Sequence, residues 1–186
     1  ASRAFANVSR SASTRSRVRA SFSWVPGDSW EIFGPEKAVT EIRGQLLAGG
    51  AVEGSLAEME FDRITAGIPF VPADVGPGDL PNEGGLEDVA ISYTKGCYLG
   101  QEVMSRLKNL GQVRRRLQVV RGRGTPPAPL AALYQGEKKI GEVRSVGTRA
   151  GEFVALAMVS LVNLTPTAGI SLEPAGPVVM TLDAHG

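Results

Sequence analysis

From residue 117 onwards the chain consists of short apolar segments that recur roughly every ten residues. They are rich in β-branched residues or alternate between apolar and polar positions, and Gly, Pro or Asn separates them: 117–120, 132–134, 139–145, 153–158, 170–172 and 177–182. Evenly spaced short strands are typical of antiparallel barrels and sandwiches. The pattern therefore predicts a small antiparallel β-domain over residues 117–186, with a domain boundary near residue 116.

The preceding part, residues 18–116, mixes strand and helix patterns. Residues 18–25 and 29–33 are expected strands around a Pro-Gly-Asp turn, and Pro35 fits the first turn of a helix. A short strand is expected at 51–53, and Ser55 with Glu58 forms the spacing of a capping box for a second helix. This order predicts an α+β layer. Residues 1–17, rich in Ala, Ser and Arg, are interpreted as a tail or remnant outside it, although their composition also resembles an organelle transit peptide.

A long Pro- and Gly-rich segment follows, over residues 67–86. Segments of this length without regular structure are uncommon in compact domains and are often functional. Alternation at 89–93 predicts a short strand, and apolar residues at helical spacing predict a helix over 100–110 that ends at Gly111.

The only cysteine of the chain lies between these two elements, in the stretch Lys-Gly-Cys-Tyr-Leu-Gly-Gln-Glu at 95–102. The thiolate is the reactive and ligating form of cysteine, and both a nearby cation and a helix N-terminus favour it. We therefore take Cys97 and Lys95 as the candidate catalytic pair. The other polar or glycine positions of the stretch are candidate ligand-binding residues, which turn the chain, orient a ligand or cap the helix: Gly96, Tyr98, Gly100, Gln101 and Glu102.

Competing interpretations accompany these residues. Cys97 could instead be a buried, inert residue in a strand-to-helix turn. A cysteine protease is not expected, because the only histidine, His185, stands at the C-terminus. We expect no metal site from this chain alone, whereas a cluster shared with a partner stays open. Arg63 is a candidate for binding a carboxylate ligand, with pairing to a neighbouring acid such as Glu60 as the alternative.

Charge is distributed in blocks. Residues 1–27 contain five arginines and no acid, residues 53–102 contain ten acids, and residues 103–136 contain seven basic residues and no acid. Such blocks indicate either charged faces that pair across the fold or a basic rim for an anionic ligand or RNA. Aromatic residues do not interleave with the second basic block, so direct nucleic-acid binding is not expected. No apolar run approaches the length of a membrane span, so no membrane association is expected.

The motif also resembles a known family. Residues 95–102 match the K-G-C-Y-x-G-Q-E signature of the YgfZ/Iba57 family, folate-binding-type proteins of iron–sulfur cluster assembly related to the T-protein of glycine cleavage. Four further stretches resemble motifs of the same family: 63–69 (R-I-x-x-G-x-P), 80–86 (L-P-x-E-x-x-L), 111–117 (G-x-v-x-R-x-L) and 140–145 (i-G-x-v-t-S). The resemblance extends over about residues 18–186.

The resemblance implies a fold and a role. The fold would be α+β, with a partial ferredoxin-like portion of a T-protein-like fold followed by a C-terminal antiparallel β-barrel. The role would be that of a tetrahydrofolate-linked accessory factor in iron–sulfur cluster assembly or repair that acts through Cys97. Its partners would be iron–sulfur enzymes, including those that modify tRNA, or assembly proteins. The alternative is a folate-dependent aminomethyltransferase. The implied location is the cytoplasm of a bacterium or an organelle matrix in a eukaryote.

Overall fold

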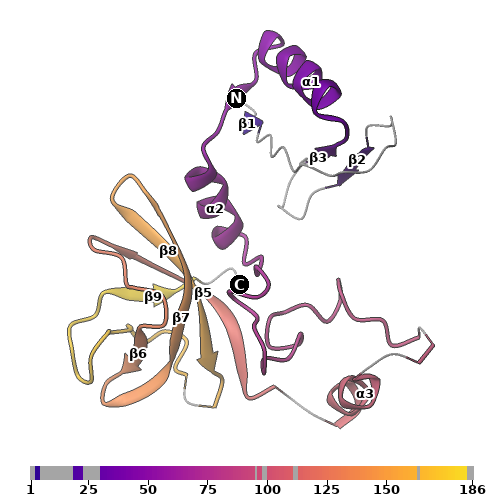
Figure 1. Ribbon diagram of the computed structural model, residues 1–186. Coiled ribbons are helices and arrows are strands. Elements are labelled where there is room, and N and C mark those ends of the chain that lie inside the picture. The colour runs from indigo at the N-terminus through magenta and orange to yellow at the C-terminus, as the bar shows by residue number, and fades with distance from the viewer. Residues whose placement is uncertain are drawn as a thin grey trace.

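The C-terminal part of the chain forms one curled antiparallel sheet (Figure 1). The structure is a computed structural model, and it describes residues 3–4, 19–22, 30–94, 96–97, 100–110, 113–162 and 164–183. The strand order is β6-β7-β8-β5-β9. The strands are β5 (Arg115–Arg123), β6 (Ala132–Gln135), β7 (Lys138–Arg149), β8 (Glu152–Ser160) and β9 (Met180–Leu182).

The sheet is a half-barrel whose two edges are linked by little hydrogen bonding. Ile170 forms an isolated bridge with Met180, and Ser171 forms one with Tyr134. In the described part of the chain these single bridges take the place of the strand expected at 170–172. The predicted antiparallel sheet is thus confirmed, whereas closure into a barrel by a continuous ladder is not.

Strand β8 is buried on both faces and divides its side chains between two cores. Phe153 and alternate residues after it pack with residues from the other strands of the sheet, while Val154, Leu156 and Met158 face a second cluster. Successive side chains of a strand point to opposite faces, so a continuous apolar run produces two apolar surfaces. The second surface is covered by helix α2 (Leu56–Thr65), which Figure 1 shows beside the sheet.

The start of α2 is the capping box that the sequence predicts. The Glu58 backbone N–H donates to Ser55 Oγ at 3.2 Å, and the Ser55 backbone N–H donates to Glu58 Oε2 at 2.9 Å. These two bonds satisfy donors that would otherwise lack partners at the first turn. The helix therefore begins at a defined residue, which fixes the face that it presents to the sheet.

Helix α2 approaches strand β7 closely because a glycine faces it. A Cβ atom at Gly147 would lie only 2.9 Å from Cα of Phe61. The guanidinium of Arg149 lies 4.2 Å from the centre of the Phe61 ring and donates to Asp62 Oδ1 at 2.7 Å. Residues on both sides of residue 116 consequently share one core. The domain boundary there stays a prediction.

The N-terminal elements form two separate strand pairs and a helix. The predicted strands near 18–25, 29–33 and 51–53 and the first helix are all present, but β1 pairs only with β4 and β2 only with β3. Their bounds are β1 (Arg3–Ala4), β2 (Arg19–Phe22), β3 (Trp30–Phe33), α1 (Glu36–Ala48) and β4 (Val52–Glu53). A ferredoxin-like layer is therefore not confirmed. Within the expected tail 1–17, β1 is structured, and the rest lies outside the described residues.

The segment between α2 and the cysteine motif is a series of turns. The prediction of a strand at 89–93 is wrong. The Ala90 backbone N–H instead donates to the Leu86 carbonyl at 2.9 Å and closes a helical turn. Val89 is 65% exposed there, so it is not buried against a core as the apolar position of an alternating strand would be. No helix among the described residues is long and apolar enough to cross a lipid bilayer.

Candidate functional site

Cys97 is exposed at the end of the turn-rich segment. Its neighbour Gly96 is exposed as well. The alternative that Cys97 is buried is therefore wrong, and its reactivity stays a prediction. Lys95 and Tyr98 lie outside the described residues, so their proposed roles beside the thiol stay predictions.

Helix α3 (Gln101–Leu110) begins directly after Gly100 and confirms the predicted helix. Gly100 has a φ of 86°, a conformation that favours glycine, and its carbonyl accepts the Met104 backbone N–H at 3.2 Å. Gln101 is half-buried and Glu102 is exposed in the first turn. The sharp turn into the helix thus explains why glycine stands at position 100. The predicted end at Gly111 lies outside the described residues.

Arg63 is held by two carboxylates. Its Nε atom donates to Glu60 Oε2 at 2.9 Å, and its Nη1 atom donates to Asp74 Oδ2 at 2.8 Å. Burial opposes the charged guanidinium, but the hydrogen bonds and charges of Glu60 and Asp74 outweigh it, so the pKa of Arg63 lies above its ordinary value. The hydrogen bond from Arg63 lowers the pKa of Glu60. The pairing of Arg63 with Glu60 is thus confirmed, and a contact between Arg63 and a ligand stays a prediction.

Three carboxylates of the turn-rich segment have a shared geometry. Each accepts a backbone N–H three or four residues earlier in the chain and also pairs with an arginine. They are Asp74 with Phe70 N–H, Asp79 with Gly76 N–H and Glu83 with Leu80 N–H. A carboxylate fixed in this way shapes its own turn and attaches that turn to another element. Sequence reasoning missed these residues, although an acid three residues after a turn position is a recognisable signal.

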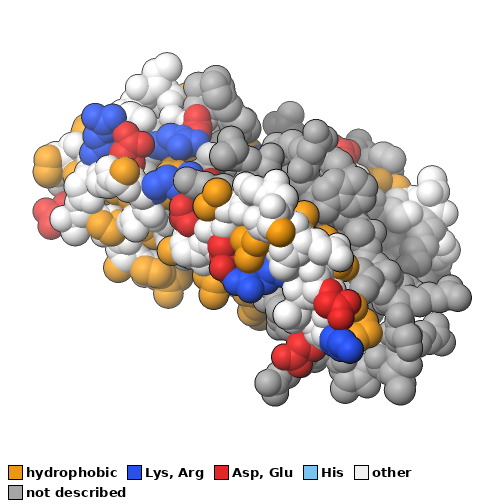
Figure 2. Space-filling model, turned by 90° about the horizontal axis from the view of Figure 1, so that it is seen from above, with side chains coloured by type: hydrophobic (Ala, Val, Ile, Leu, Met, Phe, Trp, Pro, Cys, Tyr) orange, Lys and Arg blue, Asp and Glu red, His pale blue; other side chains and the backbone are white. Residues whose placement is uncertain are grey.

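Two arginines of the sheet receive these carboxylates. Arg115 on β5 lies 2.7 Å from Glu83 Oε1 and 2.9 Å from Asp79 Oδ1, and Arg144 on β7 lies 3.4 Å from Asp79 Oδ1. The hydrogen bond with Glu83 is the main cause that raises the pKa of Arg115. Figure 2 shows acidic and basic side chains adjacent on one face of the molecule. In the described residues, Arg115 of the second basic block therefore pairs with two acids of the 53–102 block.

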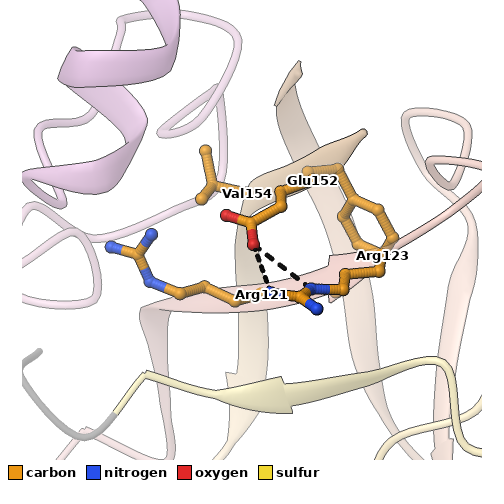
Figure 3. Close-up of a pocket in the computed structure, with 6 residues that line it drawn as sticks. Arg121, Arg123, Glu152 and Val154 are labelled. Carbon is orange, nitrogen blue, oxygen red and sulfur yellow. Dashed lines mark hydrogen bonds and ion pairs between the residues drawn. The ribbon is translucent and has the colours of Figure 1, made fainter. Parts of the chain in front are cut away.

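A shallow depression of about 230 Å³ lies over β5 and β8, away from the motif in sequence (Figure 3). Its lining includes Arg121, Arg123 and Glu152. Arg123 Nη2 lies 2.7 Å from Glu152 Oε1, and Arg121 pairs with Asp183. Pockets that enclose a drug-sized ligand usually measure at least about 300 Å³. This depression is too small for a folate, and its two cations already have carboxylate partners.

Metal ligation by the described residues alone is not supported. They contain no group of three or more His, Cys, Asp or Glu side chains that could hold a metal ion. Iron–sulfur clusters are usually held by about four cysteine thiolates. Among the described residues, Cys97 could therefore supply at most one thiolate ligand to such a cluster.

The antiparallel sheet agrees with the coarse fold that the sequence resemblance implies, and the exposed Cys97 follows Gly96 shortly before helix α3. No protein-family model matches the chain. Comparison with curated proteins confirms the resemblance: the chain is a homologue of the iron–sulfur cluster assembly factors IBA57 and of YgfZ.

Three of these relatives, from two mammals and a bacterium, illustrate the extent of the similarity. The chain is 35% identical over 121 residues to the mitochondrial iron–sulfur cluster assembly factor IBA57 of Mus musculus, a match over 64% of this chain and 33% of the relative. It is 37% identical over 102 residues to the Homo sapiens protein of the same name, over 54% of this chain and 28% of the relative. It is also 42% identical over 55 residues to the tRNA-modifying protein YgfZ of Colwellia psychrerythraea, a match over 29% of this chain and 17% of the relative. The chain thus spans about a third or less of the relatives that it matches.

Proposed function

We propose that this chain belongs to an accessory factor of iron–sulfur cluster assembly or repair, in which Cys97 supplies the functional thiol. The similarity to IBA57 proteins carries the proposal, because their names state this role. The intact motif at 95–102 and the exposure of Cys97 support it. The location that follows from the mitochondrial relatives is an organelle matrix in a eukaryote, and the bacterial counterpart is the cytoplasm.

The chemistry available to Cys97 is that of a single accessible thiol. A thiolate can bind iron or exchange with a disulfide, and both reactions need access to a second molecule. Exposure provides this access, and residues 1–186 contain no second cysteine with which Cys97 could form a disulfide. The names of the IBA57 relatives favour iron binding, so the proposed partner is an iron–sulfur protein that contributes the remaining ligands of a cluster.

Replacing Cys97 by serine is expected to abolish the support of iron–sulfur enzymes. Serine keeps the size of the side chain but is a poor ligand for cluster iron, so the fold stays and the proposed function is lost. The measurement is the activity of iron–sulfur enzymes in cells that lack the endogenous protein and express the variant. The matched control is Thr94→Ala, an exposed position in the same segment. Full activity with Cys97→Ser would refute the role of the thiol.

The tetrahydrofolate link is a separate part of the proposal. It is supported by the sequence resemblance, whereas Arg63 and the depression of Figure 3 already have carboxylates beside their cations. Calorimetry of the full-length protein with tetrahydrofolate measures it directly. We expect binding that Arg123→Gln leaves unchanged, because the depression does not fit a folate. An absence of heat at millimolar ligand would remove folate from the proposal while leaving the Cys97 test unaffected.

A further inference from the structure

The turn around Glu83 is attached to the sheet by an unusually complete set of contacts. The Arg115 guanidinium donates to both carboxylate oxygens of Glu83, at 2.7 and 3.0 Å. The Leu117 backbone N–H on β5 donates to the Glu83 carbonyl at 2.7 Å. Glu83 is only 7% exposed. A two-pronged arginine–carboxylate contact fixes orientation as well as distance, so this turn has one position on β5.

The attachment continues from this turn towards the cysteine. Asn82, beside Glu83 and also buried, donates from Nδ2 to the Tyr93 hydroxyl at 3.4 Å. Arg116, the neighbour of Arg115 on β5, lies 2.9 Å from Glu87 Oε1. The stretch from Glu83 to Tyr93 is therefore connected to the sheet at its beginning and middle, and to the attached turn at its end.

The last of these contacts stands four residues before Cys97. Four residues of fully extended chain span at most about 14 Å, so a fixed Tyr93 keeps the Cα atom of Cys97 within that distance of the Cα atom of Tyr93. Without the attachment at Glu83 and the contact at Tyr93, Cys97 would stand farther along the chain from these fixed contacts and could reach a larger volume, because the span of a chain segment increases with its length.

We propose that Glu83, Arg115 and Tyr93 are positioning residues that hold the Cys97 segment at a defined place relative to the sheet. This inference rests on the proposed function, because a defined place matters only if Cys97 meets a partner. A tethered reactive group has a higher effective concentration at its target than a freely moving one. The acid of the 80–86 motif and the middle arginine of the 111–117 motif thereby act on the thiol without touching it.

The test measures the position of Cys97 and needs no activity. Because the chain has one cysteine, a nitroxide label attaches to Cys97 alone, and Glu137→Cys, in an exposed turn between β6 and β7, provides a second label. Double electron–electron resonance then gives the distribution of distances between the labels. We expect one narrow distribution of distances in the parent chain. In Glu83→Gln and Arg115→Gln we expect the width of this distribution to increase by about twofold or more, because more residues then separate Cys97 from the nearest fixed contact.

Further variants separate positioning from loss of fold. Tyr93→Phe removes a hydroxyl and keeps the ring, and Arg115→Lys keeps the charge but cannot form the two-pronged contact, so both should broaden the distribution less than Arg115→Gln. Glu152→Gln, which breaks an exposed ion pair on the same sheet, is the matched control and should leave the distribution unchanged. Far-ultraviolet circular dichroism checks that the sheet is intact in each variant.

An unchanged distribution in Glu83→Gln and Tyr93→Phe would overturn the inference. So would unimpaired support of iron–sulfur enzymes by Arg115→Gln when its distribution is broad, because positioning would then be irrelevant to function. If the distributions broaden as expected but Cys97→Ser still supports the enzymes fully, the proposed role of the thiol fails while the positioning of its segment is upheld.

Discussion

Replacing Arg63 by methionine is expected to lower the free energy of unfolding by about 3–5 kcal/mol. The reason lies in its partner: Asp74 is completely buried, and its Oδ2 atom depends on Arg63 and on the Phe70 backbone N–H. Removing the cation leaves a buried carboxylate with one donor, a state that costs far more than the ion pair contributes. Urea-induced unfolding followed by circular dichroism measures the change.

The control for the buried pair of Arg63 and Asp74 is an ion pair that is exposed to solvent. Arg123 is 84% exposed and pairs with Glu152 on the surface of the sheet. Exposed pairs contribute roughly 0–1 kcal/mol, so Arg123→Met should lie within that range. The double variant Arg63→Met with Asp74→Asn removes both charges and should recover part of the loss. A change of less than about 1 kcal/mol in Arg63→Met would show that the pair is not needed for stability and would free Arg63 for a ligand.

Replacing Ile64 by alanine is expected to destabilise the protein by about 2–5 kcal/mol. Ile64 is fully buried and lies in the cluster that joins α2 to strands β5 and β8. The substitution removes three carbon atoms from the contact, and the closely packed strands behind it cannot fill the space. Thermal or urea unfolding should show the lower stability as a shift of a single transition, because the helix and the sheet share this core.

The matched control is Leu56→Ala on the same helix. Leu56 is 72% exposed, so its loss should change the free energy of unfolding by no more than about 0.5 kcal/mol. An effect of Ile64→Ala as small as that of Leu56→Ala would mean that α2 is not docked on the sheet in solution. Two separate transitions in Ile64→Ala would place the helix and the sheet in independent folding units and support a boundary at residue 116.

Local signals in the sequence predicted the elements well where neighbours in the chain decide them. The capping box of Ser55 and Glu58 and the helix after Gly100 both depend on contacts within four residues, so residue types at fixed spacing predict them. The strand at 89–93 was mispredicted for the converse reason. Its alternation needed a partner strand, and the chain instead forms a turn between Leu86 and Ala90.

The candidate site was predictable only in part. The spacing of apolar residues predicted the helix after Gly100, whereas the sequence left open whether Cys97 is buried or exposed, and the structure shows it exposed. The attachment of Glu83 to Arg115 spans 32 positions in the sequence, and no periodicity indicates which arginine of three in a row receives which acid. The direction in which each β5 side chain points settles that pairing.

By itself, the sequence determined that antiparallel strands follow residue 116, where each helix starts and which cysteine the proposed function depends on, because period, capping and turn residues act over a few positions. Only the tertiary structure decided that β8 has a helix on its second face, that the sheet edges meet through single bridges, and that the acidic segment is attached to arginines of the sheet. These features depend on which distant groups can be buried or paired together. That is a property of the folded chain as a whole, because the cost of burying a charge is set by what surrounds it.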